Sequence, residues 1–386
     1  VSIVNQLKKN KKLESVGGAY YITGLVDSVP SVANVENYAK IVLEKAMLRQ
    51  LIMISHSLSK DAYDASQGVD ELLDQAEQSI FSISQRRLRG GFQHIDPILH
   101  ETFEKLDQIH SRSGDVTGIA SGLVDLDELT SGFQPGELII IAGRPAMGKT
   151  ALALSMARNA AVDYGHSVGI FSLEMANHQL ALRLLCAEAK VDSHLVRTGK
   201  LPKRQWQNLS VSVGILAEAA IYLDDTPAIS VLELRAKARR LKAEHNIDIL
   251  IVDYLQLMSG PKGAESRQQE ISTISRSLKA LAKELDIPVI ALSQLSRAVE
   301  QRSEHRPQLS DLRESGAIEQ DADLVIFLYR QWIYTQEDED RGKAKIIVAK
   351  HRNGPTGTLD AAFIDRFARF ENYSAIGDEM GTKVPF

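Results

Sequence analysis

Residues 137–150 read ELIIIAGRPAMGKT, and this stretch decides the fold. Its second part, residues 143–150, fits the pattern G-x-x-x-x-G-K-[ST] of a phosphate-binding loop, the P-loop. The apolar, β-branched run before it predicts a buried strand, and the good helix formers at 151–158 predict a helix. Strand, glycine loop and helix in this order turn backbone N–H groups toward a triphosphate.

The residues of this loop have separate expected roles. The Lys149 ammonium would reach the β- and γ-phosphates, and the Thr150 hydroxyl would hold Mg²⁺. ATP and Mg²⁺ are therefore the expected cofactors. The nucleotide-binding residues predicted in the loop are Gly143, Arg144, Pro145, Ala146, Met147, Gly148, Lys149 and Thr150.

Composition narrows the class of protein. The 386 residues suffice for two or three domains, and no apolar run is long enough to span a bilayer. The net charge of −5 gives no overall basic surface, so a nucleic-acid site must be local or assembled by several subunits. The single cysteine, Cys186, excludes an intramolecular disulfide and fits a reducing cytoplasm. The chain starts at Val1, so we expect a fragment of something longer.

Three domains are expected along the chain. Residues 1–90 form a helical domain, 91–117 a linker helix with a hinge, and 118–386 an α/β domain. Within the first, glycines and Pro30 mark 1–33 as the tail of a domain. Helical spacing then predicts helices over 35–59 and 70–84, which suggest an antiparallel hairpin of the kind used for assembly.

A third amphipathic helix begins at Asp96-Pro97, where Asp96 fits the N-cap and Pro97 the first helical turn. The Ser- and Gly-rich residues 111–118 after it predict a flexible connection. The apolar face of this helix must be buried either on its own domain or on a neighbouring subunit, and the residues alone leave both open.

From residue 118 strands alternate with helices, which predicts a mainly parallel sheet with ligands at the carboxyl ends of its strands. Besides the P-loop strand, the expected strands are 167–173, 247–252, 288–292, 322–328 and 344–349. Glu174 follows the first and could polarise an attacking water, or simply belong to a helix turn. Asp253 ends the second and fits a Mg²⁺-binding aspartate. Gln294 after the third could contact a γ-phosphate, or be an ordinary loop amide.

Two basic segments have weaker signals. Lys350 and Arg352 follow the last strand and could reach the nucleotide of a neighbouring subunit, although the residues alone favour a solvated basic turn. The polar segment 294–321 could contact phosphates through backbone N–H groups, but a surface loop of mixed charge fits it better on composition alone.

The set of motifs resembles the bacterial replicative DNA helicases of the DnaB family. The order and spacing match over nearly the whole chain. The matching stretches are residues 125–133, 143–150, 171–175, 251–258, 292–297, 310–316 and 349–357.

The resemblance implies a RecA-like P-loop core behind an all-α collar, in a homohexameric ring that encircles single-stranded DNA. The ring would move 5′ to 3′ and unwind duplex at a replication fork. Primase would bind the N-terminal hairpin, a loader would assemble the ring, and the helix at 96–112 would dock on the next subunit. No membrane is involved, and the site of action is the cytoplasm, at the nucleoid. The chain departs from the family in lacking the start of the collar.

The resemblance also assigns roles to residues. Lys149 and Thr150 bind phosphates and Mg²⁺, Glu174 activates water, Asp253 supports the metal, and Gln294 couples the γ-phosphate to DNA. The remaining assignments are Lys350 and Arg352 as a finger pair acting on the neighbouring subunit, Arg183 near the nucleotide, and Arg313, Glu314 and Gly316 on the DNA backbone.

Two other functions stay open at this stage. A RecA-type recombinase would share the P-loop, Glu174 and Asp253 but would form open filaments, and the helical collar and linker argue against it. An assembly scaffold locked by ATP is the other, although it would not need Glu174.

Overall fold

The computed structural model describes residues 2–9, 12–27, 35–64, 94–100, 103–104, 116–260 and 266–373, together with positions 68, 72, 76 and 79. Within this range the side chains of a few helical residues, among them 313–316, also fall outside the description. The chain divides into two compact units, Val1–Asp107 and Gln108–Phe386.

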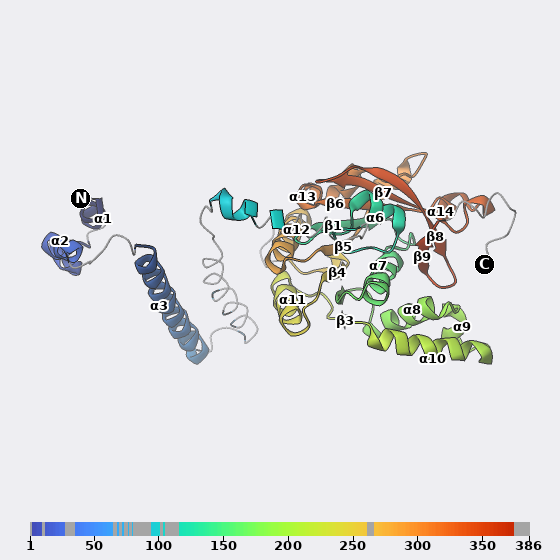
Figure 1. Cartoon of the computed structure of the whole chain (residues 1–386), viewed down its shortest axis with the longest axis horizontal. Helices are drawn as coiled ribbons and strands as arrows, with labels where there is room; N and C mark the ends of the chain where they lie inside the picture. Colours follow the sequence, from blue (N-terminus) through green and yellow to red (C-terminus); the bar gives the residue numbers. More distant parts are fainter. Residues whose placement is uncertain are drawn as a thin grey trace. The chain divides into compact units, whose positions relative to one another are not determined.

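The N-terminal unit is helical throughout its described part (Figure 1). It contains α1 (Ser2–Lys9), a 3-10 turn (Glu14–Val16), α2 (Gly18–Asp27) and α3 (Val35–Asp64). The break between α1 and α2 falls at Gly17, whose φ of 96° lies in the left-handed region that favours glycine. The predicted helix at 35–59 is confirmed and runs five residues further than expected. The predicted partner at 70–84 lies outside the described residues, apart from helical positions 72, 76 and 79.

The start of the linker helix differs from the prediction. Helical structure begins at residue 95, so Asp96 lies inside the helix rather than at its cap. The His94 ring supplies the cap instead, because its Nδ1 accepts the Asp96 N–H at 3.3 Å. Residues 95–100 and 103–104 are helical, and the rest of the predicted helix lies outside the described residues.

The C-terminal unit is built on a nine-stranded sheet of order β3-β2-β4-β5-β1-β6-β7-β8-β9. Its first six positions are parallel and the pairs from β6 to β9 are antiparallel. All six predicted strands are present, whereas β3, β8 and β9 were missed because they are short or half-exposed. The strands are β1 (Leu138–Gly143), β2 (Val168–Ser172), β3 (Ile221–Asp224), β4 (Ile249–Asp253), β5 (Val289–Gln294), β6 (Leu324–Tyr329), β7 (Lys343–His351), β8 (Gly357–Ile364) and β9 (Arg369–Asn372).

Helices cover both faces of the sheet (Figure 1). On one face α7 and α8 pack into an apolar core with alternate residues of β1, and on the other α11 and α12 do so. Buried parallel strands of this kind explain why their sequences are continuously apolar. The helices are α6 (Val124–Thr130), α7 (Lys149–Arg158), α8 (Asn177–Ala189), α9 (Ser193–Arg197), α10 (Lys203–Glu218), α11 (Val231–His245), α12 (Arg267–Leu285), α13 (Gly316–Asp321) and α14 (Trp332–Thr335).

Cys186 behaves as the composition predicted. It is fully buried on α8 among Ala189, Val191, Leu201 and Leu209, and it forms no disulfide. Burial raises the pKa of its thiol, so the group is a small apolar side chain rather than a nucleophile.

Candidate functional site

The P-loop joins the end of β1 to the start of α7, as the sequence predicted. A Cβ added to Gly143 would lie 3.1 Å from the carbonyl oxygen of Leu328 on β6, so the loop leaves the sheet where a side chain does not fit. Gly148 adopts φ 98° and precedes the helix without a side-chain cap on the first-turn N–H groups. Uncapped N–H groups at a helix N-terminus form an anion site, so this end of α7 suits a phosphate.

Lys149, Thr150 and Asp253 meet at this end of the sheet. The Thr150 hydroxyl donates to Asp253 Oδ2 at 2.8 Å, and Lys149 Nζ donates to the carbonyls of Gly143 and Arg144 at 3.0 and 3.4 Å. Burial lowers the pKa of Lys149, although Asp253 and Glu174 partly restore it. Burial also raises the pKa of Asp253, against the hydrogen bond from Thr150. Both charges are therefore under-solvated and would gain from a bound ligand of opposite sign.

The donor set at Thr150 and Asp253 fits Mg²⁺. A hydroxyl and a carboxylate oxygen lie side by side, and Asp253 is only 3% exposed. Mg²⁺ is held by few protein oxygens together with waters and substrate phosphates. Among the described residues no group of three or more His, Cys, Asp or Glu side chains is arranged to hold a metal by itself. The site therefore suits a metal that arrives with a nucleotide.

The raised pKa of Asp253 predicts a stability gain on its neutralisation. Because the folded-state pKa exceeds the unfolded one, ionised Asp253 costs stability above its folded pKa, and the cost disappears as pH falls. Asp253→Asn should therefore raise the Tm of the nucleotide-free protein at neutral pH, while abolishing Mg²⁺-dependent ATP hydrolysis. The gain in Tm should shrink as the pH is lowered, and thermal unfolding of both proteins across pH measures it.

Asp224, at the end of β3, is a matched control with the opposite sign. Burial raises its pKa, but hydrogen bonds from Thr226 and Lys237 outweigh burial and leave the pKa lowered. Its contribution is present above the unfolded pKa and is lost as pH falls through the folded pKa. Asp224→Asn should therefore lower the Tm at neutral pH. A lower Tm for Asp253→Asn as well would contradict the assignment of Asp253 as an under-solvated charge.

Glu174 and Gln294 reach the same edge from the neighbouring strands. Ser172 on β2 pairs with Asp253 on β4, and the Leu173 N–H donates to the Asp253 carbonyl at 2.7 Å. Glu174 follows directly and its side chain is exposed. Gln294 pairs in register with Gly143, the first residue of the P-loop, and is also exposed. Five predicted residues, Lys149, Thr150, Glu174, Asp253 and Gln294, therefore share one edge of the sheet.

Gln256 supports this edge and was not predicted as a site residue. Its Nε2 donates to Ser293 Oγ at 3.0 Å and to the Gln294 carbonyl at 3.2 Å. Its Oε1 accepts the Gln294 N–H at 3.3 Å. An amide in a turn after Asp253 gives no sequence signal for such a contact, because its partners lie 37 and 38 residues away.

Arg144 in the P-loop directs its side chain to the segment that follows β5. It is buried, and it donates to the Leu295 carbonyl at 2.8 Å and to Glu300 Oε1 at 2.7 Å. The P-loop is thereby tied to the segment that follows Gln294. The predicted contact between Arg144 and a phosphate stays a prediction, and it would be made by the backbone of Arg144.

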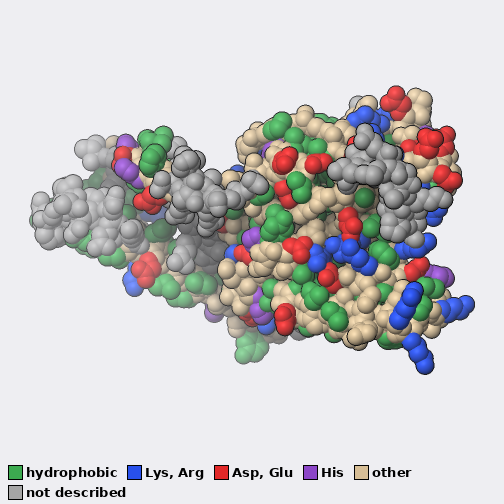
Figure 2. Space-filling view, turned by 45° about the vertical axis from the view of Figure 1, so that its right-hand side comes forward, with side chains coloured by type: hydrophobic (Ala, Val, Ile, Leu, Met, Phe, Trp, Pro, Cys, Tyr) green, Lys and Arg blue, Asp and Glu red, His purple; other side chains and the backbone are tan. Residues whose placement is uncertain are grey.

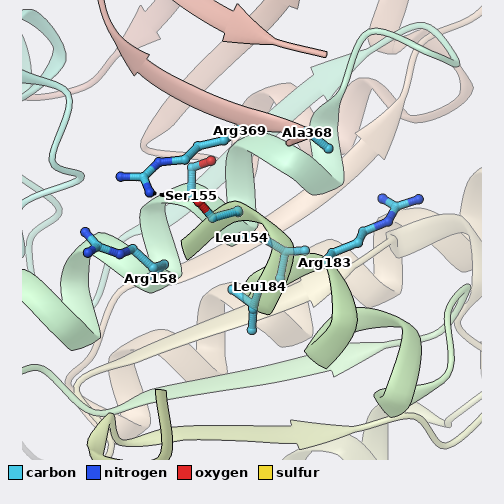
Figure 3. Close-up of a pocket in the computed structure, with 8 residues that line it drawn as sticks. Leu154, Ser155, Arg158, Arg183, Leu184, Ala368 and Arg369 are labelled. Atoms are coloured by element: carbon cyan, nitrogen blue, oxygen red, sulfur yellow. Dashed lines mark hydrogen bonds between the residues drawn. The ribbon is translucent and has the colours of Figure 1, made fainter. Parts of the chain in front are cut away.

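Arg183 lies on the exposed side of α8. It helps to line a pocket between α7, α8 and the start of β9, opposite Arg158 and Arg369, and its side chain points away from those two arginines (Figure 3). Arg158 is held by Glu188 and Asp163, whereas the charge of Arg183 offsets a small part of the rise in the Asp253 pKa that burial causes. This electrostatic contact agrees with a place for Arg183 near the nucleotide, which stays a prediction.

Lys350 and Arg352 lie at the opposite edge of the sheet. β7 is antiparallel to β6, and Lys350 pairs with Val325, near the start of β6. The P-loop lies beside the other end of β6, where Gly143 neighbours Leu328, and at ~3.3 Å per residue the five residue steps from Asp323 to Leu328 span about 16 Å. Lys350 Nζ donates to the carbonyls of Glu319 and Ala322 at 2.6 and 2.8 Å. Arg352 pairs with Asp323 at 2.9 Å. Neither cation serves the P-loop of its own chain.

The segment predicted to grip DNA forms a 3-10 helix (Leu309–Ser315) followed by α13 rather than an extended loop. The buried Asp311 organises it, because its carboxylate accepts the Gln308 N–H at 2.7 Å and Arg302 Nη1 at 2.9 Å. The backbones of Arg313, Glu314 and Gly316 lie here, while the side chains of Arg313 and Glu314 lie outside the described part.

Figure 2 shows acidic side chains gathered at the upper right of its face and basic side chains at the lower right, so neither sign of charge covers the face drawn. Across the described helices, none is both long enough and apolar enough to cross a bilayer.

Comparison with known proteins gives consistent matches over the whole chain. The model of the DnaB-like helicase C terminal domain matches residues 118–372, and that of the DnaB-like helicase N terminal domain matches residues 1–44. The replicative DNA helicase DnaB of Geobacillus stearothermophilus is 49% identical over 98% of this chain and 84% of that protein. The replicative DNA helicase DnaC of Bacillus subtilis is 48% identical over 99% of this chain and 84% of its own length.

Solved structures agree. A DnaB-like replicative helicase, described with its interactions with primase, matches with a TM-score of 0.78 at 36% identity, over 97% of this chain and 87% of that chain. A separately solved ATPase domain matches with a TM-score of 0.70 at 40% identity, over 74% of this chain and all of that chain.

Proposed function

The chain belongs to the family of DnaB-like replicative DNA helicases, and we propose that it works as a homohexameric ring that moves 5′ to 3′ on single-stranded DNA and unwinds the replication fork. As a member it is an ATP-hydrolysing helicase with a RecA-like core. The ring, the direction and the fork are the steps that this proposal adds.

The proposal rests on the distance between the P-loop site and the two cations Lys350 and Arg352, which lie at opposite ends of the strands. Lys149, Thr150, Glu174 and Asp253 share one edge of the sheet, whereas Lys350 and Arg352 lie at the other. A complete hydrolytic site therefore needs the far edge of a second copy beside the P-loop of the first. Such a head-to-tail contact repeats around a closed ring when its rotation closes.

Each residue then has a task in the reaction. The uncapped N–H groups of α7 and Lys149 would bind the triphosphate, and Thr150 and Asp253 would hold Mg²⁺, which would neutralise charge on the phosphates. Glu174 would orient a water and accept its proton as the water attacks the γ-phosphorus and the bond from that phosphorus to the ADP oxygen breaks. Arg352 and Lys350 of the adjacent subunit stabilise negative charge that develops on the transferred phosphoryl group.

DNA contact at the ring's pore would use few charges per subunit. The 3-10 helix at Leu309–Ser315 follows Gln294 in sequence and is tied to it, because the Ser296 N–H donates to the Asp311 carbonyl at 3.1 Å. We assign the backbone-gripping role to Arg313, Glu314 and Gly316. Six copies of such a segment suffice for a sequence-independent phosphate grip.

Partners follow from the family and from exposed apolar residues. The solved relative with primase supports a primase contact, which we assign to the N-terminal helices. On residues 95–104 the side chains of Ile95, Leu99 and Phe103 are 55–72% exposed, which supports docking of this helix on the next subunit. A loader would open or assemble the ring on DNA at the nucleoid.

The decisive test is unwinding of a forked DNA with a 5′ tail. With ATP and Mg²⁺ the parent protein should separate the strands, and Lys149→Ala should not, because it removes the cation that binds the triphosphate. A fork with only a 3′ tail is the control for direction. ATP hydrolysis on single strands without any strand separation would contradict the motor and favour a RecA-type filament.

A further inference from the structure

Arg330, the first residue after β6, has a buried side chain that contacts the backbone of the P-loop. Its Nη1 donates to the Ala146 carbonyl at 3.4 Å, and its Nη2 donates to Asp365 Oδ1 at 2.7 Å. The guanidinium carbon lies 3.9 Å from the centroid of the Phe363 ring. Only 3% of the residue is exposed, so this cation is committed to these contacts rather than to solvent.

The contact falls on the most strained part of the P-loop. Ala146 has φ 65°, a left-handed conformation that costs a residue with a Cβ about 1–2 kcal/mol. With Ala146 in this conformation its carbonyl turns to Arg330, which supplies a charged donor for it. Charge-assisted hydrogen bonds are stronger than neutral ones, so this bond helps to offset the cost.

Phe363 and a second aromatic residue, Phe370, pack against Gly148, the next glycine of the loop. A Cβ built on Gly148 would lie 3.3 Å from the Phe370 ring and 3.5 Å from the Phe363 ring, and these two rings pack 4.7 Å apart. Phe363 therefore lies under Gly148 and beside Arg330 at once. β8 carries Phe363, and β9, the last strand in the sheet order, carries Phe370. β9 packs on α7 (Figure 1).

We propose that Arg330, seated on Phe363, is a positioning residue that holds the P-loop in its phosphate-binding conformation before the nucleotide arrives. This role rests on the nucleotide site proposed above. Arg330 itself does not touch the reacting atoms. A loop that is already held in its bound conformation loses less entropy on binding, so Arg330 raises the affinity for the nucleotide. The chemical step depends on Glu174 and on the adjacent subunit, so turnover at saturation is independent of Arg330.

An arginine is required by this geometry. The planar guanidinium stacks on a ring while its fork reaches two acceptors, Ala146 and Asp365, in different directions. A lysine can keep the charge and one hydrogen bond, but it cannot stack and bridge together. Arg330→Lys should therefore lie between the parent and Arg330→Gln.

The test measures nucleotide affinity directly. In the full chain, Arg330→Gln should raise the Kd for a fluorescent ADP analogue and the KM for ATP about tenfold, which corresponds to about 1.4 kcal/mol, with kcat within about twofold of the parent. Phe363→Leu should raise both constants as well, by a smaller factor. The control is Arg235→Gln, which removes another buried arginine, paired with Glu284 between α11 and α12, and should lower the Tm without changing either constant.

Contrary outcomes are distinct. Unchanged Kd and KM in folded Arg330→Gln, or a loss confined to kcat, would overturn the positioning role. If Arg330→Gln does not fold, unchanged Kd and KM in both Arg330→Lys and Phe363→Leu would overturn it equally. Failure of the parent itself to bind the ADP analogue would instead refute the proposed nucleotide site.

Discussion

Arg352→Ala is expected to lower the turnover number for ATP by about a thousandfold or more while leaving the affinity for ATP nearly unchanged. In the single chain Arg352 lies at the start of β6, beside Asp323 and at the opposite edge of the sheet from Lys149. It therefore contributes nothing to nucleotide binding by its own P-loop. In the proposed ring its guanidinium would act only when a second subunit brings a nucleotide to it, where charge develops in the transition state.

The fold should survive this substitution. Asp323 keeps two other partners, Lys279 and the Leu138 N–H, so no buried carboxylate is left without a donor. Lys345→Ala is the matched control, because Lys345 is an exposed lysine on β7, the strand that precedes Arg352, and its loss should leave turnover unchanged.

Mixing two inactive variants tests the trans arrangement itself. Lys149→Ala subunits have an intact far edge, and Arg352→Ala subunits have an intact P-loop. Where one lies beside the other, a complete site forms, so ATPase activity should reappear when the two proteins are mixed and exchange subunits. Hydrolysis restored in no mixture, although subunit exchange is verified with a fluorescent label, would show that Arg352 does not act across an interface.

Glu174→Gln is expected to lower turnover by about 10²–10⁴-fold, with ATP binding retained. The amide keeps the size and hydrogen-bonding reach of the carboxylate but cannot accept a proton from water. The Glu174 side chain is exposed, so its replacement should change stability little. Removing its charge also removes one cause of the raised Asp253 pKa.

Single-turnover hydrolysis and equilibrium binding of ATP, measured on the same preparation, separate the two effects. Glu218→Gln, a change of an exposed carboxylate at the end of α10, is the control. Near-parent turnover in Glu174→Gln would assign water activation elsewhere. A large loss of ATP binding would instead make Glu174 a binding residue. Turnover abolished with binding retained would exclude an ATP-locked scaffold.

Much of the site was predictable because its signals are local. The loop pattern at 143–150 and the apolar strands before Glu174, Asp253 and Gln294 are written in consecutive residues. Parallel strands bring their carboxyl ends to one edge, so the meeting of these residues followed from the strand assignment alone. The structure brings Thr150 and Asp253 together across 103 residues in this way.

The expectation that strand ends meet at one side of the sheet did not hold for Lys350 and Arg352. That expectation assumes parallel strands, but β7 runs antiparallel to β6, and its carboxyl end lies at the far edge of the sheet. Neither residue type nor spacing indicates strand direction, because a buried apolar strand looks the same both ways. The position of these cations at the end of the sheet opposite the P-loop became visible only in the folded sheet.

The sequence by itself determined that this protein has a P-loop core with an acidic and an amide side chain at successive strand ends, because strand periodicity and loop chemistry depend on neighbours along the chain. Only the tertiary structure decided which residues support that core. Gln256 beneath Gln294, Asp323 beside Arg352 and Arg330 behind Ala146 each contact partners 29 to 184 residues away. Such contacts depend on sheet order and packing, which bring distant residues within hydrogen-bond range and leave no periodic trace in the sequence.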